Sequence, residues 1–154
     1  MTSPLRLCVR RTPSPDELNR AVRVSLSVPS DVGIVEETVE LVALHCFAGR
    51  RPSSRTTFRL RLALAEALAN AIQCGNQECS TRTVSVNVEL YPDRIRLGVS
   101  DEGDGFDPAG APDPLHPDTL ESPCGRGLFI IRNLADHVEF NDRGNTIWMT
   151  LPRS

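Results

Sequence analysis

The chain has 154 residues, of which 40% are hydrophobic and 24% are charged, and its formal net charge is −3. This length and composition predict about one globular domain, and the slightly acidic balance argues against a dedicated nucleic-acid binder or a polybasic membrane anchor. No apolar run approaches the roughly 20 residues that span a bilayer, and the N-terminus lacks the apolar core of a secretory signal. We therefore expect a cytoplasmic protein.

The basic residues are all arginines, seventeen in number, and the sequence contains no lysine. A P-loop needs a lysine on its phosphates, and a eukaryotic-type kinase needs one on its third strand. Schiff-base chemistry is excluded for the same reason. If the protein handles nucleotide phosphates, it must use backbone amides, a metal ion and arginine.

The cysteines are odd in number and form no CxxC pair, which argues against zinc and favours scattered reduced thiols. The five are Cys8, Cys46, Cys74, Cys79 and Cys124.

Strand-like alternation and helical periodicity follow one another along the chain. In chain order they predict a strand at 5–10, a loop at 12–15, a strand at 22–28, a helix to residue 48 capped by Ser30 or Asp31, a helix from about 55 to 74 closed by Gly75, a hairpin of 83–90 and 94–100, a helix at 127–136, and a final hairpin of 137–142 and 146–151. These elements predict an α+β fold, a two-layer sandwich of a mostly antiparallel sheet with helices on one face. We expect residues 1–20 to be an N-terminal extension and residues 21–154 to form the domain.

The second predicted helix contains the stretch "LALAEALANAIQCGN", in which two polar residues interrupt an apolar sequence. Residues four apart share one face of a helix, so Glu66 and Asn70 lie in one row with Leu62 and Cys74. The neighbouring row is apolar and holds the helix on the sheet; it consists of Leu60, Leu64, Leu68 and Ile72. The two polar residues either face solvent or belong to a site at the helix border.

The segment "SDEGDGFDP" follows a predicted strand and carries Asp101, Gly103 and Gly105. Glycine allows backbone turns and close approaches that a side chain would block. A calcium loop is excluded because Pro112 stands where its glutamate should be. A plain turn is the other interpretation.

The segment "CGRGLFIIRNLAD" places Gly125 and Gly127 at the threshold of a helix. The free amides and the dipole of a helix N-terminus favour an anion. No third glycine completes a dinucleotide fingerprint, and no strand immediately precedes the segment.

Taken together, the order ExxxN on a helix, then strand-DxGxGF, a long loop and GxGLxxI opening a helix resembles the histidine-kinase-like (Bergerat-fold) ATPase superfamily. The resemblance covers about residues 20–151. The stretches "EALANAI", "DEGDGFDP", "GRGLFIIRNLAD" and "GNTIWMTL" look most like the bacterial anti-sigma-factor serine kinases.

This resemblance implies an ATP site with a magnesium ion. In the family, the residue matching Asn70 ligates Mg²⁺ and the residue matching Glu66 is the general base. Asp101 matches the aspartate that accepts a hydrogen bond from the adenine amino group, and Thr146 matches a threonine near the adenine. The residues matching the turn beneath the base are Gly103 and Gly105, and those matching the phosphate cradle are Gly125, Arg126, Gly127 and Leu128. The loop from about 108 to 124 would be the lid.

Two positions depart from the family pattern. Cys74 stands where the family often has histidine, and the segment before the second glycine box lacks the lid arginine of some members. Arg126, between the glycines, is the remaining arginine near the transferring phosphate, so we include it with Glu66 as catalytic.

The resemblance implies an anti-sigma factor that binds ATP-Mg, sequesters a sigma factor and phosphorylates a serine on a STAS-type antagonist. The alternative is a catalytically weak or inactive ATP-binding, or nucleotide-free, module that regulates by exchanging partners. Members of this family commonly pair, so a homodimer is suggested by analogy. A sensor kinase is disfavoured because the chain is too short for a phosphoacceptor hairpin. His45 is the one helical candidate for a phosphoacceptor, and we expect it to be a packed or exposed residue, while His116 and His137 show no triad partner. The basic cluster of Arg50, Arg51, Arg55, Arg59 and Arg61 is either a solvated face or a docking site for an acidic partner.

Overall fold

Six strands form one antiparallel sheet in the computed structural model, which describes residues 6–12, 21–105 and 123–154. The strands are β1 (Arg6–Thr12), β2 (Ala21–Pro29), β3 (Thr83–Leu90), β4 (Arg94–Ser100), β5 (His137–Phe140) and β6 (Thr146–Pro152). Their order in the sheet is β1-β2-β3-β4-β6-β5, and all pairs are antiparallel. β1 falls in the segment expected to extend the domain, and it hydrogen-bonds along β2.

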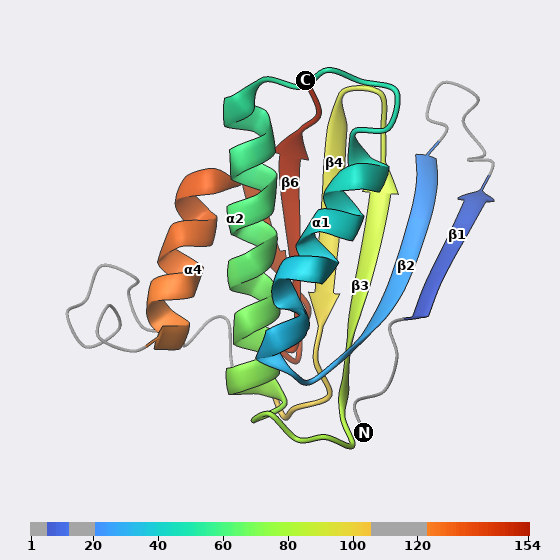
Figure 1. Cartoon of the computed structure of the whole chain (residues 1–154). Helices are drawn as coiled ribbons and strands as arrows, with labels where there is room; N and C mark the ends of the chain where they lie inside the picture. The colour runs from blue at the N-terminus through green and yellow to red at the C-terminus, as the bar shows by residue number, and fades with distance from the viewer. Residues whose placement is uncertain (1–5, 13–20, 106–122) are drawn as a thin grey trace.

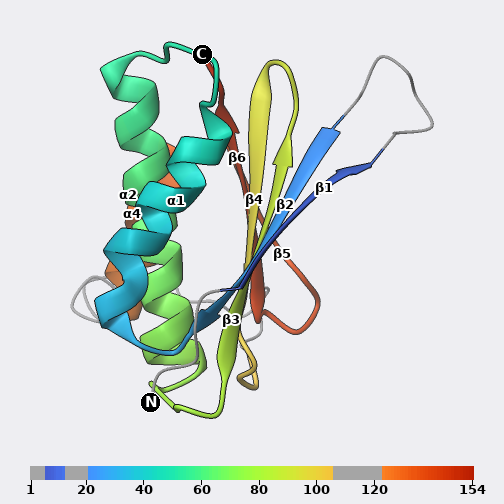
Figure 2. The ribbon, with the colours of Figure 1, turned by 45° about the vertical axis from the view of Figure 1, so that its right-hand side comes forward.

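Among the described residues, three helices cover one face of this sheet and no helix lies on the other (Figures 1 and 2). They are α1 (Val35–Cys46), α2 (Ser54–Asn70) and α4 (Pro123–Leu134), with a short 3₁₀ turn, η1 (Val32–Ile34), before α1 and a π-helical turn, η2 (Ala71–Gly75), after α2. The core lies between helices and sheet, where the apolar row of α2 meets the alternating valines, leucines and isoleucines of β2, β3 and β4. The predicted α+β sandwich is confirmed.

Asp31, and not Ser30, caps the turn η1 that leads into α1. The Asp31 side chain accepts a hydrogen bond from the Gly33 amide at 2.9 Å and so caps η1, as acidic N-caps do. Ser30 is instead buried, with its hydroxyl donating to the Arg82 carbonyl at 2.6 Å.

The third helix begins earlier than predicted. We expected it to begin at residue 127, but α4 begins at Pro123, a residue type favoured in the first turn because it has no amide to satisfy. Gly125 and Gly127 therefore lie within the helix and not at its threshold, although both remain close to its N-terminal end.

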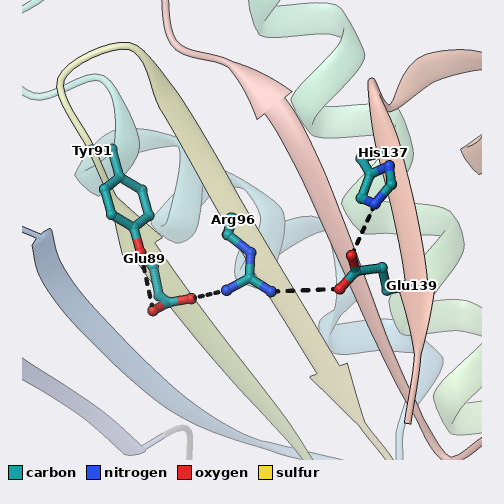
Figure 3. A network of polar contacts seen from close by, with 5 residues as sticks. All are labelled: Glu89, Tyr91, Arg96, His137 and Glu139. Atoms are coloured by element: carbon teal, nitrogen blue, oxygen red, sulfur yellow. Dashed lines mark hydrogen bonds and ion pairs between the residues drawn. The ribbon is translucent and has the colours of Figure 1, made fainter. Parts of the chain in front are cut away.

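The open face of the sheet carries a polar network drawn in Figure 3. Glu89 is 9% exposed and accepts from Arg96 at 2.7 Å, and Arg96 stacks over the Trp148 ring. His137 lies 2.8 Å from Glu139, because residues two apart on a strand share one face. This partner was not identified from the sequence. This network is on the side of the sheet opposite the helices.

The cysteines differ in state. Cys46 is buried in the core, and desolvation raises its pKa to about 12, so it remains a protonated thiol. Cys79 is also free. Cys74 is disulfide-bonded, so the expectation of reduced thiols is wrong there.

Within the described residues, no helix combines the length and apolar character that a membrane span requires.

Candidate functional site

The last turns of α2 present the two polar residues singled out in the sequence. Ser53 caps α2 by accepting a hydrogen bond from the Thr56 amide at 3.1 Å, and this cap sets the residue at which the helix begins. The apolar row from Leu60 to Ile72 is fully buried, as predicted, whereas Glu66 and Asn70 are half-buried. The two side chains therefore lie at the border of the core, on one face of the helix.

After Asn70 the helix widens into the π turn η2. The Asn76 amide donates to the Ala71 carbonyl at 2.8 Å, a five-residue spacing that replaces the usual four. The predicted row therefore does not continue at α-helical spacing to Cys74. The same turn brings Gly75 against the Asp101 side chain so closely that a Cβ at position 75 would overlap that carboxylate. Gly75 is thus required for the approach of α2 to the loop after β4.

Asp101 is the first residue after β4 and is anchored on both sides. Its amide donates to the Asn145 carbonyl at 2.9 Å, and its Oδ1 accepts from the Gly103 amide at 2.8 Å. Desolvation raises the pKa of Asp101, while the Gly103 hydrogen bond and the charge of Arg82 oppose the rise. The loop therefore holds an oriented, half-buried carboxylate beside the end of α2.

The two glycines of this loop pack against backbone on opposite sides. A Cβ on Gly103 would overlap the Gly75 carbonyl, and one on Gly105 would overlap the Arg143 carbonyl in the turn between β5 and β6. Gly105 also has a φ of 77°, in the left-handed region that favours glycine. Both glycines predicted to form a tight turn are needed for it.

We expect Gly105→Ala to lower the free energy of unfolding far more than Gly49→Ala, measured by urea titration. Gly49 has a nearly equal φ of 72°, but a Cβ there would meet nothing within 4 Å. The control should therefore cost about 1 kcal/mol of backbone strain, and Gly105→Ala on the order of 3 kcal/mol because strain and overlap add. Equal losses would show that Gly105 is not confined by the neighbouring turn.

The first turns of α4 lie against the polar face of α2. A Cβ on Gly127 would be 2.9 Å from Asn70 Oδ1 and 3.0 Å from Glu66 Oε2, so only a glycine permits this spacing. Gly127 is buried, Gly125 and Leu128 are half-buried, and the Arg126 side chain is exposed. The second glycine motif thus lies beside the two polar residues of α2.

A hydroxyl pair lies at the end of β4 beside the Asp101 loop. Ser100 Oγ and Thr146 Oγ1 are 2.8 Å apart, in strands β4 and β6 that pair at this point. Thr146 therefore lies one residue from Asp101 across the sheet. Most of the expected lid, with His116, lies outside the described residues, and its last two positions, 123 and 124, belong to α4.

Three segments distant in sequence thus meet along α2. Glu66 and Asn70 face the start of α4, and Gly75 faces Asp101. These contacts are separated along the helix by about five to nine residues, or roughly 8–14 Å at the α-helical rise.

At the end of α2 near Gly127, a magnesium ion would take few ligands from the protein and most of them from bound phosphate and water. Within the described residues, no three His, Cys, Asp or Glu side chains cluster to hold a metal. Mg²⁺ is commonly bound by one or two protein oxygens, with phosphate and water completing its shell. The amide oxygen of Asn70, which faces Gly127 in the N-terminal part of α4, could serve as such a ligand.

The basic cluster is partly committed to contacts within the chain. Arg59 Nε donates to the Leu134 carbonyl at 2.7 Å, Arg61 pairs with Glu40, and Arg50 donates to the Pro92 carbonyl at 3.0 Å. These three arginines join α2 and the preceding loop to other elements, so the five do not form one uncommitted docking patch.

Comparison with known proteins identifies the family to which the chain belongs. The family model described as a histidine kinase-like ATPase domain matches residues 12–151. The serine-protein kinase RsbW of Bacillus subtilis is 31% identical over 148 residues, which cover 86% of each chain. RsbW of Bacillus licheniformis is 35% identical over 59% of this chain and 61% of its own, and RsbW of Staphylococcus aureus (strain Newman) is 31% identical over 58% and 62%. The chain therefore belongs to the histidine kinase-like ATPase domain family, and it is similar to members that carry the name of a serine-protein kinase.

Proposed function

We propose that the protein is a cytoplasmic anti-sigma factor with serine/threonine kinase activity. It binds ATP with Mg²⁺, sequesters a sigma factor, and phosphorylates a serine on a STAS-type anti-sigma-factor antagonist. The observation that carries the proposal is the approach of Gly127, in the N-terminal part of α4, to both Asn70 and Glu66, because it brings the positive end of a helix dipole next to a proposed metal ligand and a proposed base. Similarity to proteins named as serine-protein kinases supports the reaction class.

Each site residue has a role in this proposal. Asn70 ligates the metal, which would neutralise phosphate charge, and Glu66 accepts the proton of the attacking serine hydroxyl. Asp101 accepts from the adenine amino group, with Thr146 nearby, and Gly103 and Gly105 shape the turn beneath the base. In the proposal the phosphates lie beside the N-terminal turns of α4, at Gly125, Gly127 and Leu128, where the helix dipole is positive, with Arg126 as the cationic side chain. This arrangement would handle a triphosphate without a lysine.

The experiment is phosphotransfer with purified components. The chain, Mg²⁺, γ-labelled ATP and the antagonist are combined, with an antagonist whose target serine is replaced by alanine as the control. We expect label on the parent antagonist alone, and co-purification of a sigma factor when the antagonist is absent. ATP binding without transfer would contradict the kinase proposal. It would favour a partner-switching module instead, the reading that the exposed Arg126 side chain supports.

We expect ATP affinity to fall as the pH is lowered through the raised pKa of Asp101. The carboxylate is the form that accepts from the adenine amino group, so protonation removes the charged acceptor, at a higher pH than for an ordinary aspartate. The dissociation constant should rise by at most about tenfold per pH unit, the limit for one proton.

The control for this titration is Asp101→Asn, because the asparagine side chain is uncharged and does not titrate. We expect it to bind ATP weakly and to show only the pH dependence that comes from the nucleotide itself. A variant and parent with parallel profiles in calorimetric titrations would remove Asp101 as the adenine acceptor.

A further inference from the structure

Asn76 is a buried polar residue to which the proposed function gives no role. It follows the π turn at the end of α2 and is fully buried. Its side chain makes three hydrogen bonds: Nδ2 donates to Ser30 Oγ and to the Thr83 carbonyl, both at 3.0 Å, and Oδ1 accepts from the Glu102 amide at 2.7 Å. An amide side chain that uses both donors and an acceptor inside a protein has a fixed orientation.

These bonds join four segments at one point. Ser30 follows β2, Thr83 begins β3, Asn76 follows the turn after α2, and Glu102 belongs to the loop after β4. A reciprocal bond closes the cluster, because the Thr83 amide donates to Glu102 Oε2 at 2.7 Å. The helical layer and the sheet are therefore tied together beside the Asp101 loop.

The bond to Glu102 acts directly on the geometry of Asp101. Asn76 holds the amide that follows Asp101 in the chain, while the next amide, that of Gly103, donates to Asp101 Oδ1. The Asp101 carboxylate also packs against Gly75, next to Asn76 in sequence. Two consecutive loop amides are thus held, one by Asn76 and one by the carboxylate itself. Loss of the Asn76 acceptor would leave a loop amide without its partner and free the loop to shift away from α2.

We infer that Asn76 is a positioning residue for adenine recognition: it sets the Asp101 loop against the end of α2 so that the carboxylate points at the purine 6-position. The inference rests on the proposed function, in which Asp101 reads the adenine amino group. It adds that base discrimination depends on a side chain that does not touch the nucleotide.

The test compares the affinities of ATP and inosine triphosphate, which carries a carbonyl in place of the 6-amino group. The variants are Asn76→Ala and, as a matched loss of a buried polar group, Ser30→Ala. Ser30→Ala removes the bonds to Asn76 and Arg82 but keeps the Asn76 bond to Glu102. We expect Asn76→Ala to weaken ATP binding on the order of tenfold and inosine triphosphate binding by less than about threefold. Ser30→Ala should keep the parent ratio, although both variants lose stability.

An unchanged ratio in Asn76→Ala, or an equal fall in Ser30→Ala, would overturn the inference while leaving the proposed function intact. A parent with no preference for ATP would overturn both. If Asn76→Ala does not fold, amide hydrogen exchange in the parent decides. A Glu102 amide that exchanges as slowly as strand amides supports the positioning role, and one as fast as the exposed Asp104 amide refutes it.

Discussion

Asn70→Ala is expected to abolish the magnesium-dependent part of ATP affinity, a loss on the order of 100-fold. The residue ends α2 beside Gly127, where its amide oxygen adjoins the helix N-terminus proposed to hold the phosphates. Alanine is the strongest helix former, so the change leaves the α2 backbone favourable. Calorimetric titration of ATP with Mg²⁺ and with a chelator measures the effect, and urea unfolding reports on the fold.

Asn133→Ala provides the matched control for this substitution. Asn133 is an exposed asparagine on α4 whose side chain donates to the Phe129 carbonyl at 2.8 Å, so the same chemical group is removed from a helix six residues beyond Gly127. The control should bind ATP as the parent does in both conditions. Asn70→Ala with parent affinity in the presence of Mg²⁺ would remove Asn70 as a metal ligand.

Glu66→Ala is expected to keep ATP binding within about threefold of the parent but to lower phosphotransfer to serine by about 10²–10⁴-fold, the usual contribution of a general base. The carboxylate lies one helical turn before Asn70 and faces the same glycine of α4, so it can reach a hydroxyl at the phosphate end. Single-turnover transfer to the antagonist, with ATP binding measured in parallel, separates the two effects.

The control here is Glu40→Ala, which removes an exposed helical carboxylate from α1 together with its ion pair to Arg61. Surface pairs of this kind contribute about 0–1 kcal/mol, so both binding and transfer should stay near parent values. Glu66→Gln should lose transfer like Glu66→Ala, because an amide keeps the shape and cannot accept the proton. Transfer at the parent rate in either Glu66 variant would exclude it as the base.

The fold was predictable where a single periodicity governs a segment. β3 and β4 have the bounds that alternation predicts, since one face of each is buried against the helices. The buried row of α2 follows from four-residue spacing for the same reason. Spacing alone does not bring separate segments together, so only the family resemblance assigned Glu66, Asn70, Asp101 and the second glycine motif to one site. The structure places Glu66 and Asn70 beside Gly127, and Asp101 beside Gly75.

The features that were missed depend on long-range contacts. Ser30 resembles a helix cap in sequence, yet its hydroxyl bonds to Arg82 inside the protein. Asn76 follows a glycine and is typical of a turn, but a π turn that nothing local encodes carries it into the core. The third helix was predicted to begin at residue 127, but proline can begin a helix and α4 begins at Pro123. Cys74 has a bonding partner that its own neighbourhood in the sequence does not indicate.

A crystal structure with Mg²⁺ and a non-hydrolysable ATP analogue tests the central claim most directly. We expect the analogue along the end of α2, with its purine amino group at Asp101, its phosphates at the amides around Gly127 and the ion on the Asn70 amide oxygen. A nucleotide bound elsewhere, or a space between α2 and α4 that the chain's own side chains fill in the presence of saturating analogue, would contradict the account.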